Sequence, residues 1–116
     1  MTKTIDDILE LVDIKKAIQQ DRLSILELNK ELQVYAKKKA ETEKAYRVAL
    51  AKEIIMLREQ KLPATLISDI ARGNVANLKF ERDLADSMFT SVRDSLKGLQ
   101  SATSSLQSIL RTQEEI

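Results

Sequence analysis

Apolar residues recur with a seven-residue period over the first half of the chain. Two columns of positions, one helical turn apart, carry most of them: Leu11, Ile18, Ile25, Leu32, Lys39, Tyr46 and Glu53, and Ile14, Asp21, Leu28, Tyr35, Thr42, Ala49 and Met56. Ten of these fourteen positions are apolar, which is typical of a helix that pairs with another helix along one face. We call this face the seam.

Signals at both ends delimit this helix. Thr4 precedes two aspartates and is a predicted N-cap, and the first helix breaker along the chain is Pro63. We therefore predict a long helix over about residues 5–61, on the order of 80 Å at about 1.5 Å per residue. The seam becomes polar at Lys39 and Thr42. The sequence leaves open whether the helix is interrupted there or changes its buried face.

Two more helices are predicted after Pro63. A short one over about residues 64–72 stops at Gly73, a predicted left-handed C-cap, and a long one over about residues 75–112 begins after Asn74. The long one carries its own seven-residue column, predicted to pack and to form oligomer contacts: Leu78, Ala85, Val92, Leu99 and Leu106. We predict an all-α fold and a single domain over residues 1–116. It is a long, coiled-coil-like antiparallel helical hairpin with a short helix at its elbow.

Such a hairpin has apolar positions left over after its two long helices pair, and a homo-oligomer is expected to cover them. Composition agrees with helices, since two glycines and one proline in 116 residues are too few for a sandwich, barrel or doubly wound sheet. The chain has no cysteine and no histidine. We therefore expect no enzyme activity, no metal site and no cofactor.

Positive charge is concentrated in the middle of the chain. The net charge is +1, but residues 15–61 hold twelve Lys and Arg against seven Asp and Glu. The candidate DNA-binding residues are Lys37, Lys38, Lys39, Lys44 and Arg47, with Arg58 and Lys61 toward the elbow. Ammonium groups at helical spacing neutralise phosphates without reading bases. The alternative is a solvated face on which Lys37 pairs with Glu41 and Lys39 with Glu43.

Four segments carry a resemblance to a known family: Glu43–Leu50, Leu66–Gly73, Leu78–Ala85 and Leu106–Arg111. By the order of elements and a few residue types, the chain resembles small helical phage proteins, the recombination mediators of the UvsY type. The resemblance implies an oligomer that binds single-stranded DNA through basic and aromatic residues of the first helix. It also implies a recombinase or a single-strand-binding protein as partner, in the cytoplasm of a bacterial host.

The function expected from the sequence is therefore that of a non-catalytic accessory of DNA recombination or replication, binding single-stranded DNA without sequence specificity. A structural or adaptor coiled coil, such as an assembly chaperone or scaffold, is the alternative. A third hypothesis is that the protein inhibits a host protein. No apolar run is long enough for a membrane span and no signal peptide is evident, so we expect a cytoplasmic protein without membrane contact.

Overall fold

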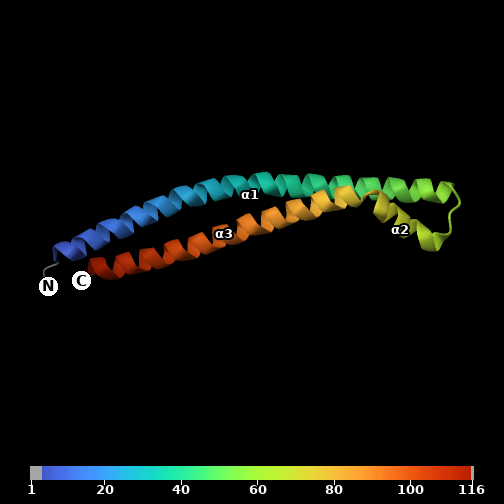
Figure 1. Cartoon of the computed structure of the whole chain (residues 1–116). Helices are drawn as coiled ribbons and strands as arrows, with labels where there is room; N and C mark the ends of the chain where they lie inside the picture. Colours follow the sequence, from blue (N-terminus) through green and yellow to red (C-terminus); the bar gives the residue numbers. More distant parts are fainter. Residues whose placement is uncertain (1–3, 116) are drawn as a thin grey trace. The chain divides into compact units, whose positions relative to one another are not determined.

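The protein is all-α. The computed structural model describes residues 4–115, apart from the side chains of Leu9 and Glu115, and contains three helices (Figure 1). They are α1 (Ile5–Glu59), α2 (Ala64–Asn74) and α3 (Ala76–Glu115). Long helices packed against each other are what the seven-residue period predicts.

The helices form two compact units. Unit 1 comprises Met1–Leu32 and Ser91–Ile116, and unit 2 comprises Gln33–Thr90. Each unit contains a segment of α1 packed antiparallel to a segment of α3, and unit 2 also contains α2. Unit 2 is therefore a helical hairpin with α2 at its elbow (Figure 1).

Local signals determine where α1 begins and ends. Thr4 is its N-cap, as predicted: the backbone N–H of Asp7 donates to Thr4 Oγ1 at 3.2 Å, and the Thr4 N–H donates to Asp7 Oδ2 at 3.1 Å. At the other end Lys61 has a φ of 60°, the only described non-glycine residue with a positive φ. Its backbone N–H donates to the carbonyl of Arg58 at 3.0 Å, which closes the last turn before Pro63.

The polar seam positions near residue 40 do not interrupt α1, so the predicted interruption is wrong: the helix is continuous from Ile5 to Glu59. The buried face does change farther along the helix, where Leu57 is 4% exposed and the neighbouring seam residue Met56 is 43% exposed. Lys39 and Thr42 are half-buried, like the apolar seam positions around them. The Thr42 hydroxyl is satisfied within the helix, donating to the carbonyl of Lys38 or Lys39 at 2.9 and 3.1 Å. Polar residues stay on the seam because each finds a partner there.

The junction between α2 and α3 differs from the prediction. Gly73 does not have a positive φ, and α2 continues through it to Asn74. Asn74 does not cap α3; its side-chain amide donates to Glu53 of α1 at 3.0 Å. The two helices are separated only at Val75, whose N–H still donates to the carbonyl of Ala71 at 3.2 Å. Since this helical bond persists, the turn needs no left-handed residue.

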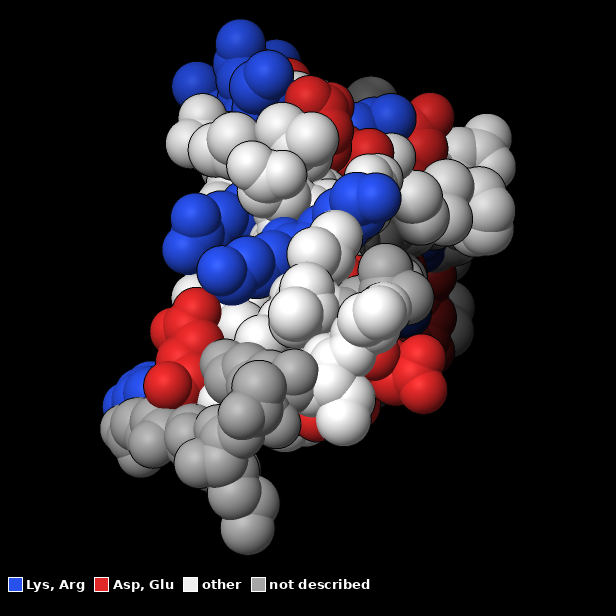
Figure 2. Space-filling model, turned by 90° about the vertical axis from the view of Figure 1, so that its left-hand side faces the viewer, with Lys and Arg blue, Asp and Glu red and all other residues white. Residues whose placement is uncertain are grey.

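In unit 1 the core is one layer of side chains between two helical segments. Ile18 of α1 and Val92, Leu96 and Thr103 of α3 are buried. The Thr103 hydroxyl lies 3.0 Å from Asp21 Oδ2, a polar contact across the seam. Seen from the end of the molecule where α1 begins, acidic and basic side chains are interspersed with uncharged surface (Figure 2).

Unit 2 has an additional core at its elbow. Leu57 of α1 and Ile67 and Ala71 of α2 are buried against one another, and Leu50 and Ile54 pack against them. This cluster holds α2 against the end of α1.

The predicted column of α3 packs within the chain. Ala85 and Val92 are buried, and Leu78, Leu99 and Leu106 are half-buried. This column therefore contributes to the pairing of α3 with α1 inside each unit.

Candidate nucleic-acid interface

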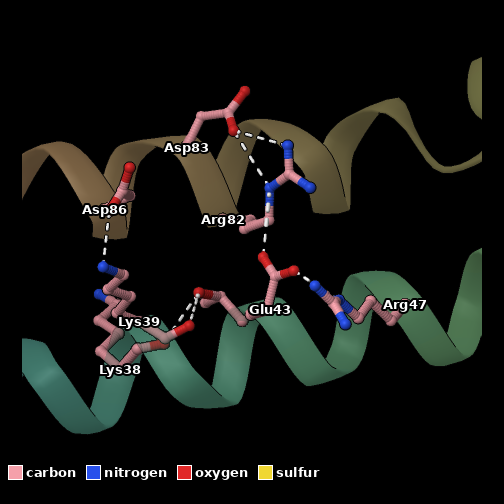
Figure 3. A network of polar contacts seen from close by, with 8 residues as sticks. Lys38, Lys39, Glu43, Arg47, Arg82, Asp83 and Asp86 are labelled. Atoms are coloured by element: carbon pink, nitrogen blue, oxygen red, sulfur yellow. Dashed lines mark hydrogen bonds and ion pairs between the residues drawn. The ribbon is translucent and has the colours of Figure 1, made fainter.

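Charged residues cross the seam of unit 2 at two places, in a network around Glu43 and in a separate pair of Lys39 with Asp86 (Figure 3). At the centre of the network, Glu43 of α1 accepts a hydrogen bond from Arg47 and forms an ion pair with Arg82. Arg47 Nε lies 2.6 Å from Glu43 Oε1, one turn along the same helix, and Arg82 Nε of α3 lies 3.5 Å from Glu43 Oε2. The Glu43 carboxylate thus links α1 with α3 and also engages the Arg47 guanidinium.

Arg82 is the cation most enclosed by this network. Its side chain is 25% exposed, and it donates from Nε and Nη2 to Asp83 Oδ1 at 3.2 and 3.0 Å. The guanidinium also lies 4.3 Å from the centre of the Tyr46 ring. The hydrogen bond to Asp83 raises the pKa of Arg82, so the cation is retained.

Lys39 belongs to the same seam. Its ammonium pairs with Asp86 of α3 at 3.0 Å and lies 4.7 Å from the centre of the Phe89 ring. It therefore serves the pairing of α1 with α3 and is not part of the outer face of α1. Tyr46 is buried beneath Arg82 and does not present its ring to a ligand.

Three lysines lie on the outer face of α1, away from the seam. Lys37 and Lys44 are seven residues apart and Lys52 follows eight residues later, which places them on one side of the helix. All three are exposed. Lys37 pairs with Glu41 at 3.8 Å, in an exposed contact that contributes little. Within residues 4–115, neither Lys44 nor Lys52 has an ion-pair partner. We call these three residues the lysine row.

The lysine row borders a shallow hollow. Lys44 and Lys52 line it together with Glu41, Ala45, Val48 and Ala49, and its volume is about 430 Å³. Its lining therefore combines small and apolar side chains with two cations and one carboxylate. A flexible anionic chain can lie along such a surface with its phosphates on the lysines.

The other predicted candidates are distributed around unit 2. Lys38 lies at the rim of a groove between α1 and α3, which it lines together with Tyr35 and Phe80. Arg58 and Lys61 are exposed at the end of α1, and neither makes an ion pair with a described residue. The seven predicted cations thus lie in four different places: on the seam, at the groove, at the elbow and on the outer face of α1.

Sequence reasoning missed two features. Lys52 lies outside the dense run of lysines, and only helical spacing from Lys44 places it in the row. In unit 1, Lys15, Lys16 and Arg22 line a second hollow of about 360 Å³. Lys15 pairs there with Glu114 of α3 at 3.4 Å. The seven-residue spacing of Lys15 and Arg22, the same as that of Lys37 and Lys44, signals this second cluster.

No protein-family model, curated protein or solved structure matches this chain. The resemblance to phage recombination mediators therefore stays a prediction. Among residues 4–115, no helical segment has the length and apolar character that crossing a bilayer requires.

Proposed function

We propose that this protein is a non-catalytic accessory of phage-type DNA recombination or replication, and that its lysine row binds single-stranded DNA without sequence specificity. The observation that supports this is the placement of Lys37, Lys44 and Lys52 on one exposed face of α1, with no acidic partner for the last two among the described residues. The resemblance adds a recombinase or a single-strand-binding protein as the expected protein partner.

The spacing of the row suits a phosphate backbone. The helical rise puts Lys37 and Lys44 about 10 Å apart along the axis, and Lys44 and Lys52 about 12 Å apart. Each ammonium then contacts phosphates several nucleotides from those of its neighbour, and no group is placed to read a base edge. Binding of this kind depends on charge and not on sequence.

The net charge of unit 2 determines how strongly one copy is expected to bind single-stranded DNA. Gln33–Thr90 contain eleven Lys and Arg against eight Asp and Glu, a modest excess. One copy of the chain therefore binds weakly, and tight binding requires several copies on one strand.

Fluorescence anisotropy of labelled oligo-dT across a salt series tests the proposal, with a duplex of the same length as comparison. The variant Lys37→Glu/Lys44→Glu/Lys52→Glu is expected to bind much more weakly than the unmodified protein. Its slope of log affinity against log salt should be smaller by about two, since each single-strand phosphate contact contributes about 0.7.

A matched control reverses three charges elsewhere. Lys30, Lys97 and Arg111 are exposed in unit 1, and changing all three to Glu alters the net charge equally. Lys30 pairs with Glu27 at 3.5 Å, as Lys37 pairs with Glu41, and the other two make no ion pair with a described residue. This control should retain most of the binding. Equal losses in both variants, or flat anisotropy for the unmodified protein at low salt, would overturn the proposal.

A structural or adaptor role is the second candidate, favoured by large apolar side chains that unit 2 leaves exposed. Phe80 is 67% exposed, Val34 64% and Ile55 56%. An adaptor should show no loss of DNA binding in the lysine-row variant, because it has none to lose. The same anisotropy series therefore separates the two functions.

A further inference from the structure

One side of unit 2 carries an apolar groove between α1 and α3, with a volume of about 740 Å³. Its α3 wall is formed by Phe80, Leu84 and Met88, which follow one another at intervals of one helical turn. They are 67%, 50% and 38% exposed. Three large apolar side chains in a row on a solvent-facing groove are typical of a surface that another protein covers.

Two opposite charges stand on the two walls of this groove. Lys38 belongs to the α1 wall and Glu81 to the α3 wall. Both are exposed, and within the part of the chain that the structure describes neither has an ion-pair partner. The groove therefore offers one unpaired cation and one unpaired anion beside its apolar row.

The helix register places these two charges symmetrically about Leu84. Because Lys39 pairs with Asp86 at 3.0 Å, Lys38 lies at the level of the α3 residue that follows Asp86, three residues from Leu84. Glu81 lies three residues from Leu84 in the other direction. At the helical rise, each charge is about 4.5 Å from the level of Leu84, on opposite walls and toward opposite ends.

We infer that the groove is the contact of a two-fold symmetric dimer, with a second copy of this chain as its occupant. A two-fold axis that lies across the mouth of the groove at the level of Leu84, perpendicular to the line from Lys38 to Glu81, exchanges the positions of these two residues, so the helices of the two copies cross. It brings Lys38 of each copy to Glu81 of the other, so the dimer contains two such ion pairs. It also directs each Phe80 toward Tyr35 of the opposite copy, where two aromatic rings pack.

This contact differs from the oligomer surface expected from the sequence. Leu78, Ala85 and Leu106 are engaged with α1 inside the chain, so the exposed row of Phe80, Leu84 and Met88 takes over the role of self-association. The inference does not depend on DNA binding. A dimer does, however, join two lysine rows and so supplies the avidity that one copy lacks.

Sedimentation velocity of the 116-residue protein without DNA tests the apolar part of the contact. The unmodified protein should sediment as a dimer in a concentration-dependent equilibrium. Phe80→Glu and Leu84→Glu should sediment as monomers with unchanged helical circular dichroism. Ile109→Glu is the matched control, because Ile109 is 46% exposed in unit 1 and outside the groove, and its dimer should persist.

A charge exchange tests the symmetry. Lys38→Glu or Glu81→Lys alone places two like-charge contacts in each dimer and should weaken dimerisation about tenfold. The double variant Lys38→Glu/Glu81→Lys restores both pairs with exchanged signs and should dimerise nearly as well as the unmodified protein. Rescue by the double variant is specific to a contact that joins these two residues between copies.

Three results would overturn the inference. One is a monomeric unmodified protein at all concentrations tested, and another is an unchanged mass for Phe80→Glu and Leu84→Glu. The third is a double charge variant no better than either single one. An unchanged mass together with a loss of oligo-dT binding in Phe80→Glu would instead assign the groove to stacking of DNA bases.

Discussion

The two units are built from the same two long helices, yet their surfaces carry opposite net charge. Unit 1 contains eight Lys and Arg against ten Asp and Glu, whereas unit 2 contains eleven against eight. Their seams differ as well: unit 1 has the hydroxyl contact of Thr103 with Asp21 and an exposed ion pair of Lys15 with Glu114, whereas unit 2 has the ion pairs of Arg82 with Glu43 and of Lys39 with Asp86. A nearly neutral chain thus contains one basic module.

The polar seam contacts show why charged residues are tolerated between paired helices. A charge on a seam contributes little net stability, because burying it costs about as much as pairing it returns. It penalises any other register, in which the same charge would face apolar side chains. In unit 2 the partners Glu43 and Asp86 fix that register, and the groove between α1 and α3 follows from it.

The largest expected effect is on the free energy of unfolding, when a buried core leucine is removed from either unit. Leu57→Ala in unit 2 and Leu96→Ala in unit 1 each remove a buried leucine, with 4% and 7% exposure. Each should cost about 2–4 kcal/mol of the free energy of unfolding. The loss should be greater for Leu57, because Leu57 packs between two helices at the elbow. Denaturant unfolding followed by circular dichroism measures both, and a greater loss for Leu96 would contradict the role of the elbow core.

A smaller effect on stability distinguishes the hydroxyl contact on the seam of unit 1 from the charged contacts on the seam of unit 2. Thr103→Val should cost about 1 kcal/mol, since it leaves Asp21 without its hydroxyl partner. Arg82→Met should also destabilise the protein, because it leaves the Glu43 and Asp83 carboxylates without this cation and removes its contact with Tyr46. Added salt should diminish the loss caused by Arg82→Met and leave that of Thr103→Val nearly unchanged. Thermal unfolding at low and high salt gives this difference, and equal salt dependence would argue against it.

The smallest effect concerns the turn after α1. Lys61→Gly should stabilise the protein by about 1 kcal/mol, because glycine adopts a positive φ without the steric cost that a Cβ atom brings. Lys61→Ala is the control: it removes the same charge but keeps the Cβ atom, and it should leave stability nearly unchanged. An equal gain in both variants would point to the charge and not to the backbone.

Much of the fold could be predicted from local signals. The N-cap Thr4, the break at Pro63 and the seven-residue period predicted three helices close to their observed bounds. The prediction for Gly73 was wrong, because glycine permits a left-handed turn but does not impose one, and the bond from Val75 to Ala71 kept the chain helical. The left-handed residue is Lys61, whose side chain gives no signal of it.

The candidate interface was less accessible to prediction. A run of three consecutive lysines points in three directions on a helix, and which of them faces a partner depends on the other helix. Lys37 lies on the outer face, Lys38 at the groove and Lys39 on the seam. Lys52, which completes the row, lies outside this run and carries no local signal of its own.

The sequence by itself determined that the chain is helical, where its helices break and which face of each helix is apolar, since these follow from propensities and spacing within one helix. Only the tertiary structure decided which polar side chains are engaged in pairing and which are free. That outcome depends on the register between α1 and α3, in which Asp86 meets Lys39 and Arg82 meets Glu43. Contacts between residues distant in sequence are set by packing, and local pattern does not encode them.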